Sequence, residues 1–233
     1  MSLQVWLPLN GNLTNQGLSP ATFSVVNSGG GLAPSTSGGK VVPGTYTRST
    51  ANTASYIKSD INFSFSGDFS MCCWAKVTGI GSAQTANGII THHGHITGGG
   101  GITMKDVSST DLRMSINTGT NDSNRTYCTY YGSTNIYNQW HHLCVTYERS
   151  TQRYRMYVDG RKETIVGYGD YITFGDTVAA RPFCLFAWST DHLSSPDYRP
   201  PCQLNDVRLY DHLLSPKEVH EIAKGLACHY KLD

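Results

Sequence analysis

The chain has 233 residues, 39% of them hydrophobic, and its 18 Lys and Arg nearly balance its 17 Asp and Glu, which leaves a formal net charge of +1. This composition predicts one large β-domain without affinity for nucleic acid or anionic membranes. We also expect no membrane insertion, because no apolar run approaches the roughly 20 residues that span a bilayer. The first residues, MSLQVWLPLN, lack the basic and apolar regions of a secretory signal.

Segments that alternate apolar and polar residues recur along the chain and predict half-buried β-strands. In FSMCCWAKV, residues 69–77, the odd-numbered side chains form one apolar face and the even-numbered side chains form the other face. The segment DLRMSINTG, residues 111–119, alternates in the same way. We therefore expect a strand in each segment.

A β-meander is predicted for residues 140–163, where two strand-like runs flank the polar turn ERSTQ. Asp159 and Gly160 then supply the positive φ angles that a second, tight turn requires. Two further strands, FCLFAW at 183–188 and QLNDVRLY at 203–210, are separated by a long polar segment. We expect that segment to be a loop at the rim of a sheet.

A helix is signalled near the C-terminus. Ser215 and Glu218 form a capping box, and Pro216 lies where a missing N–H costs nothing. The helix should end near Gly225. Its apolar residues Val219, Ile222 and Leu226 are spaced to lie on one face, so we expect it to pack against the sheet.

Seven cysteines form an odd set without paired CxxC spacing, and several lie within strand-like runs. They are Cys72, Cys73, Cys128, Cys144, Cys184, Cys202 and Cys228. We expect reduced and mostly buried thiols.

The two ends of the chain resemble each other. Residues 3–12, LQVWLPLNGN, and residues 226–233, LACHYKLD, share alternating apolar positions, an aromatic residue and a final Leu before Asn or Asp. Residues 226–233 are either a terminal strand that pairs with the first or the start of a following repeat. We treat residues 1–233 as a single domain.

Four elements occur in a characteristic order: FSMCCWAKV, WHHLCVTYE, YRMYVDGRK and LNDVRLYDHLLSPKEV. With this order, the chain resembles the concanavalin A-like, laminin-G-like jelly-roll domains of tail and other virion proteins of bacteriophages and prophages of gut Firmicutes. The resemblance spans residues 3–232. It implies an all-β fold of two antiparallel sheets packed face to face, with one short helix near the C-terminus.

The chain departs from the family at a position that bears on metal binding. Related domains often have an acid where this chain has Asn205, which weakens a carried-over calcium site. Asp60 and Asp206 remain candidates for a structural calcium ion, but no dense cluster of Asp and Asn accompanies them. We expect no other cofactor.

Catalysis is not expected. Hydrolases with this fold place paired carboxylates on one strand, as retaining glycoside cleavage requires. The four glutamates, Glu148, Glu163, Glu218 and Glu221, lie in predicted turns and in the helix instead. Nucleophile-elbow and phosphate-loop motifs are also missing from the sequence.

The stretch THHGHITGGGG, residues 91–101, could offer imidazoles to a metal, but no Cys or acid lies within four residues. His92 and His93 would also point to opposite faces of a strand. A hairpin loop that contacts a ligand is the better interpretation. We interpret His141 and His142, which open a strand, as packed histidines with satisfied hydrogen bonds; the family commonly has His at the position of His142.

A sugar site needs aromatic platforms and planar hydrogen-bonding groups. The residues that we expect to bind ligand are His92, His93, His95, Arg125, Tyr130, Trp188, Asp191, His192 and Tyr198. With the resemblance, they favour a lectin-like module of a phage or prophage tail, folded in the bacterial cytoplasm, that binds host-surface polysaccharide and contacts other virion proteins. A purely structural or assembly module without a glycan ligand is the alternative, and a glycoside hydrolase is a third hypothesis.

Overall fold

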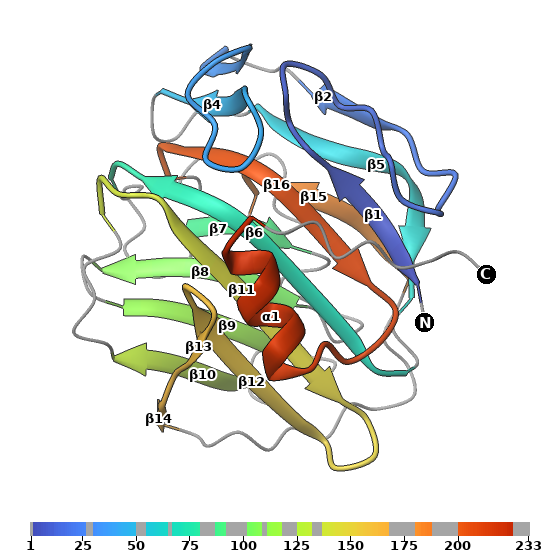
Figure 1. The fold of residues 1–233 in the computed structure, drawn as a ribbon, viewed down its shortest axis with the longest axis vertical. Helices are drawn as coiled ribbons and strands as arrows, with labels where there is room; N and C mark the ends of the chain where they lie inside the picture. The colour runs from blue at the N-terminus through green and yellow to red at the C-terminus, as the bar shows by residue number, and fades with distance from the viewer. Residues whose placement is uncertain are drawn as a thin grey trace.

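The computed structural model describes residues 2–26, 30–49, 55–64, 67–79, 87–91, 102–108, 111–117, 125–131, 137–167, 180–187 and 200–225. Within these residues, sixteen strands form two eight-stranded sheets, and one short helix follows the last strand. Figure 1 shows the two sheets as stacked layers with the helix on the outside. The predicted all-β, two-sheet antiparallel sandwich is confirmed.

The first sheet, which we call sheet A, has the strand order β13-β12-β11-β6-β16-β4-β3, and β1 also pairs with β16. Its strands are β1 (Leu3–Leu7), β3 (Leu32–Ser35), β4 (Thr45–Arg48), β6 (Phe69–Val77), β11 (His141–Glu148), β12 (Arg153–Val158), β13 (Arg161–Lys162) and β16 (Cys202–Tyr210). All of its pairings are antiparallel.

The second sheet, sheet B, has the order β14-β10-β9-β8-β7-β15-β5-β2. Its strands are β2 (Phe23–Val26), β5 (Tyr56–Phe63), β7 (Asn87–Thr91), β8 (Ile102–Ser108), β9 (Asp111–Asn117), β10 (Arg125–Tyr131), β14 (Ile165–Gly167) and β15 (Arg181–Leu185). These pairings are antiparallel as well. The strand that the sequence predicts at 183–188 corresponds to β15, which begins and ends earlier, at Arg181–Leu185. The next residue, Phe186, has a positive φ of 60° and lies outside the strand.

Alternation along β6 produces the two faces that the sequence predicts. Phe69 and Met71 lie in the core cluster that also contains residues of sheet B, such as Phe183. Cys72 points the other way, into a second apolar cluster under the helix. Trp74, on that same outer face, is only 5% exposed, so β6 is buried on both sides.

The β-meander is confirmed. β11 pairs with β12, and β12 pairs with β13. The tight turn between β12 and β13 has the expected positive φ angles, 50° at Asp159 and 75° at Gly160. A side chain at Gly160 would collide with the backbone of His220, so the turn also lets the helix approach the sheet closely.

The helix α1 (Pro216–Ala223) begins at the predicted capping box: the Ser215 side chain accepts from the Glu218 N–H, and the Glu218 side chain accepts from the Ser215 N–H. It ends just before Gly225, as expected. Val219 and Ile222 are buried, and Figure 1 shows α1 lying across the outer face of sheet A. Leu226 lies outside the described residues.

The N-terminal segment belongs to sheet A. β1 pairs with β16, which runs through the middle of sheet A. Residues 226–233 lie outside the described residues, so whether they pair or begin a repeat stays a prediction. Five cysteines, Cys72, Cys73, Cys144, Cys184 and Cys202, are buried and not bonded in disulfides, as expected. The side chains of Cys128 and Cys228 are not among those described.

We predict that Ser215→Ala lowers the free energy of unfolding by about 1 kcal/mol, because one helical N–H loses its acceptor. Chemical denaturation of both proteins measures this. Lys217→Ala is the control, since its ion pair with Glu221 is exposed and spans 3.8 Å, and such a pair on a helix contributes about 0.3–0.5 kcal/mol. Equal effects of the two substitutions would contradict a structural role for the cap.

We also predict that all seven cysteines of freshly purified protein react as thiols after denaturation without reductant. The reason is that the five cysteines within the described residues are buried and form no disulfide, as is typical of proteins that fold in a reducing environment. Alkylation followed by mass spectrometry counts the thiols. Two or more disulfides in fresh protein would show that it folds in an oxidising compartment.

Candidate functional site

Most of the ligand-binding residues predicted from the sequence lie outside the described residues. These are His92, His93, His95, Trp188, Asp191, His192 and Tyr198. Arg125 and Tyr130 lie on β10, of which the structure describes the backbone. The binding roles of all nine residues stay predictions.

The strand pairing nevertheless places the ends of the described strands that lead to these residues. β7 and β15 are antiparallel neighbours, so the chain leaves β7 toward His92 and β15 toward Trp188 at opposite ends of sheet B. The pairings of β7, β8, β9 and β10 put Arg125 at the end where β7 leads to His92. Tyr130 lies toward the other end. We name these the His92 end and the Trp188 end.

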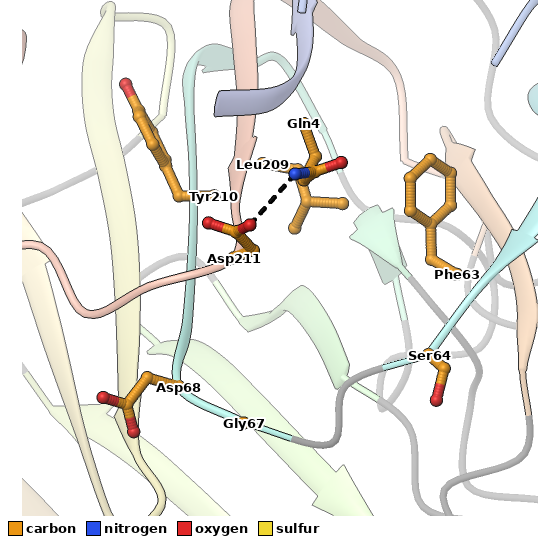
Figure 2. Close-up of a pocket in the computed structure, with 8 residues that line it drawn as sticks. All are labelled: Gln4, Phe63, Ser64, Gly67, Asp68, Leu209, Tyr210 and Asp211. Carbon is orange, nitrogen blue, oxygen red and sulfur yellow. Dashed lines mark hydrogen bonds between the residues drawn. The ribbon is translucent and has the colours of Figure 1, made fainter. Parts of the chain in front are cut away.

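A pocket of about 300 Å³ lies where β5 leads into β6 and β16 ends. Phe63 of β5 pairs with Arg181 at the start of β15, so the pocket is at the His92 end of the sandwich. Its lining residues are Gln4, Phe63, Ser64, Gly67, Asp68, Leu209, Tyr210 and Asp211. Figure 2 shows the Asp211 carboxylate and the Gln4 amide on one side and the Phe63 ring on the other.

Asp211 anchors this pocket to the N-terminal segment. Its Oδ1 accepts from the Ser2 N–H at 2.5 Å, and its Oδ2 accepts from the Ser2 hydroxyl at 2.6 Å and from Gln4 Nε2 at 3.0 Å. Burial works against the charged form, but these hydrogen bonds hold the pKa of Asp211 below its usual value. The carboxylate is therefore ionised at neutral pH and remains partly exposed, at 44%.

The remaining lining residues include an aromatic ring and a second carboxylate, which lie on different sides of the pocket (Figure 2). Phe63 is partly buried and packs edge-on against Phe183, with ring centroids 6.3 Å apart. Asp68 accepts from the Arg149 N–H through Oδ1 at 2.7 Å. A ring, two carboxylates and an amide match what a polyhydroxylated ligand needs, namely an apolar platform beside strong acceptors. Lys and Arg are missing from the eight lining residues, so the pocket disfavours anionic groups.

Sequence reasoning missed this pocket. Gln4 and Asp211 are far apart in the chain, and the β1–β16 register alone brings them together. A usable signal was present in Asp68 and Asp211, because Asp68 directly precedes one predicted strand and Asp211 directly follows another. Without the strand order, nothing connected these two positions.

The two calcium candidates lie in different sheets. Asp60 of β5 accepts from the N–H and the hydroxyl of Thr22, at 2.8 and 2.7 Å, and these bonds lower its pKa. Asp206 of β16 is 1% exposed and accepts from Trp6 Nε1 at 2.8 Å and Arg208 Nε at 2.9 Å. They do not belong to one site. Among the described residues, no three His, Cys, Asp or Glu side chains gather where they could hold a metal.

Asn205, the position where the family often has an acid, binds five backbone groups. Its Oδ1 accepts from the N–H groups of Lys40 and Val41, at 3.2 and 3.0 Å. Its Nδ2 donates to the carbonyls of Pro8, Val42 and Gly44, at 3.1, 3.3 and 2.7 Å. A carboxylate could not donate to those carbonyls. The amide thus holds the loop of residues 36–44 on sheet A.

His141 and His142 are packed, as the sequence predicts. His141 Nδ1 lies 2.8 Å from Asp159 Oδ2, and Asp159 Oδ1 accepts from the His142 N–H. Burial favours the neutral acid, but these bonds hold the pKa of Asp159 below its usual value. For the His142 ring, the part of the chain that the structure describes provides no hydrogen-bond partner to either buried nitrogen, so the expected hydrogen bond of that ring stays a prediction. That ring packs against Trp74, with centroids 5.6 Å apart.

Comparison with known proteins identifies the family. The model of the Laminin_G_3 family, of the concanavalin A-like lectin/glucanases superfamily, matches residues 45–220. A search of curated protein sequences finds no match.

None of the helices within the described parts of the chain is long and apolar enough to cross a membrane.

Solved structures share the fold at low sequence identity. Domain 4 of AbnA, a GH43 extracellular arabinanase from Geobacillus stearothermophilus in complex with arabinotriose, has a TM-score of 0.67 and 15% identity over 95% of this chain and 98% of that domain. A structure of botulinum neurotoxin type C, a toxin whose cell entry depends on interaction with two ganglioside molecules, has a TM-score of 0.64 and 14% identity over 97% of this chain. The receptor-binding domain of botulinum neurotoxin type G has a TM-score of 0.60 and 13% identity over 96% of this chain. This chain spans about half the length of the two neurotoxin chains, 50% and 51%.

We predict that Asn205→Asp lowers the free energy of unfolding by about 3 kcal/mol or more, because it buries a charge and leaves three carbonyls without their donor. Thermal and denaturant unfolding measure the loss. Gln203→Glu, on the same strand but partly exposed, is the matched control and should cost under about 1 kcal/mol. A stable Asn205→Asp protein would show that the amide donor does not hold the loop.

Proposed function

Because the chain belongs to the concanavalin A-like lectin/glucanase superfamily, we propose that it is a non-catalytic, lectin-like module that binds carbohydrate. The observation that carries the proposal is the pocket at the His92 end, where the Phe63 ring faces the Asp211 carboxylate and the Gln4 amide. C–H faces of a sugar would contact the ring, and its hydroxyl groups would donate to the carboxylates. Ligands without negative charge suit this lining best.

The structural neighbours support a carbohydrate ligand. The arabinanase domain was solved with arabinotriose, and the type C neurotoxin structure is associated with gangliosides. Both share the sandwich architecture with this chain at low identity. Since fold alone does not determine a ligand, the pocket carries the argument and these neighbours add to it.

A binding role is favoured over hydrolysis by the positions of the glutamates. A general acid for glycoside cleavage needs a raised pKa, whereas the hydrogen bond from Arg155, at 2.9 Å, lowers the pKa of Glu148. Glu218 is part of the helix cap, and Glu221 lies near Lys217 on the same helix. Glu163 follows β13. These placements offer no pair of carboxylates on one strand.

The biological setting that we propose is a phage or prophage tail protein of the gut Firmicutes, folded in the bacterial cytoplasm and carried on the virion. There, the module would meet polysaccharide on the host surface and contact other virion proteins. Buried free thiols are compatible with folding in a reducing compartment. Many copies on one virion would compensate for weak single-site affinity through avidity.

A structural or assembly module is the second candidate. The observation that favours it is that both oxygens of Asp211 already accept hydrogen bonds from Ser2 and Gln4. In that case, the carboxylate serves to fasten β1 and not to bind sugar. The two candidates differ in whether the pocket takes up a ligand at all.

We predict that the multimerised protein is retained on bacterial polysaccharides and that Gly67→Leu reduces this retention about tenfold or more, the factor that corresponds to 1.4 kcal/mol. A Cβ atom at Gly67 would meet no atom within 4 Å, and Gly67 lines the pocket, so we expect the Leu side chain to obstruct the pocket without disturbing the fold. A glycan array with neutral, amino and anionic polymers, including teichoic acids and capsular polysaccharides, measures it.

Trp188→Ala tests the opposite end of sheet B in the same assay. Loss of retention with Trp188→Ala alone, at an unchanged melting temperature, would move the site to the Trp188 end. Lys217→Ala, on the exposed face of α1, is the matched surface control. If the unmodified protein binds no glycan on the array but binds another virion protein strongly, the lectin proposal is refuted and the structural candidate is favoured.

A further inference from the structure

Two cysteines face each other under the helix. Cys72 of β6 and Cys144 of β11 are directly opposite in the antiparallel register. Residues so placed have Cα atoms about 4.5–5.5 Å apart, and a disulfide spans Cα separations of about 4.4–6.8 Å. Both side chains lie on the outer face of sheet A, because their neighbours Cys73 and Leu143 belong to the core between the sheets.

The surroundings of this pair favour a thiolate at Cys72. A hydrogen bond from Cys144 lowers the pKa of Cys72, burial opposes it, and His142 and Arg208 lower it further. Arg208 is the partner of Cys72 on the other neighbouring strand, β16. Burial, together with the nearby Cys72, raises the pKa of Cys144. One thiol is thus prepared as a nucleophile, and the other keeps its proton.

The helix is part of the cluster that separates the pair from solvent. Cys72 and Cys144 are fully buried in a cluster completed by Tyr157, Tyr210, Leu214, Val219 and Ile222. α1 has eight residues and contributes two of these side chains. A helix this short is marginal when it is detached from the protein, so its local opening requires less free energy than unfolding of the sandwich.

We propose that Cys72 and Cys144 form an oxidation site, at which a small peroxide closes a cross-strand disulfide when α1 opens. The Cys72 thiolate attacks one peroxide oxygen, the O–O bond breaks, and Cys72 becomes a sulfenic acid as hydroxide leaves. The Cys144 sulfur then attacks the Cys72 sulfur, and the sulfenic oxygen leaves as water with the Cys144 proton. The two thiols lose two electrons, and the peroxide is reduced.

The chain contains its own control for this reaction. Cys73 and Cys202 are equally buried but face the core between the sheets, where α1 does not cover them. Burial, and then the neighbouring Cys72 and Cys202, raises the pKa of Cys73 well above the usual thiol range. Opening of α1 should therefore expose the outer pair and leave Cys73 and Cys202 protected.

The test treats the folded, reduced protein with hydrogen peroxide, blocks the remaining thiols by alkylation and maps disulfides by tandem mass spectrometry. We expect one Cys72–Cys144 link that a thiol reductant reverses. Cys72→Ala and Cys144→Ala should abolish it, whereas Cys73→Ala and Cys128→Ala should leave it. Those two controls are needed because each shares a tryptic peptide with one member of the pair.

The rate of the reaction tests the role of the helix. Loss of the N-cap in Ser215→Ala should accelerate formation of the link about fivefold, the factor that corresponds to about 1 kcal/mol. Alkylation of Cys202 in the same samples should not accelerate. Equal acceleration at Cys202 would mean that global unfolding exposes all of these thiols, and over-oxidation of Cys72 without a link would mean that Cys144 does not resolve it. Either result overturns the proposal. Both can be measured in proteins that keep all seven cysteines.

Discussion

The central strands of sheet A are apolar on both faces, and much of the structure follows from the need to cover the outer one. β6 and β11 are buried along almost their whole length, as is β16. Sheet B covers the inner face, but the outer face would expose Cys72, Trp74, Cys144 and Tyr210 to water. Burying large apolar side chains stabilises a fold by about 1.5–3 kcal/mol each, so this face strongly favours a cover.

Two separate segments provide that cover, and each is held by one polar side chain of sheet A. Asn205 binds the loop of residues 36–44 through four backbone groups and binds the Pro8 carbonyl as well. Ser70 fixes the approach to α1, since its hydroxyl donates to His212 O at 2.8 Å and accepts from the Leu214 N–H at 2.9 Å. Lys40 of the loop lies over the Trp74 ring, 5.4 Å from its centroid. Apolar contacts alone have no preferred direction, so these hydrogen bonds determine where the two covering segments lie on the sheet.

Local patterns predicted the elements well. The alternation in FSMCCWAKV identified both faces of β6, and Ser215, Pro216 and Glu218 identified the start of α1, because caps and strand periodicity involve neighbours in the chain. The tight turn at Asp159 and Gly160 follows the same logic. Each of these features is encoded within about ten residues, so sequence reasoning could reach it.

Sites that depend on register could not be predicted in this way. The pocket needs Gln4 beside Asp211, and the dithiol needs Cys72 opposite Cys144. Both relations follow from which strands pair and in what register, which no local pattern encodes. The same holds for the ends of β7 and β15, which antiparallel pairing places at opposite sides of sheet B, a relation that neither strand's own sequence encodes.

The pocket and the helix cover are joined by the short segment that follows β16. Asp211 binds Ser2 on the pocket side, whereas His212 and Leu214 bind Ser70 on the helix side. Tyr210 belongs to both, since it lines the pocket and also packs in the cluster over Cys72 and Cys144. A ligand that steadies Asp211 would therefore steady the anchor of α1 as well. Because such coupling is reciprocal, closure of the helix would in turn favour the ligand-bound arrangement of the pocket.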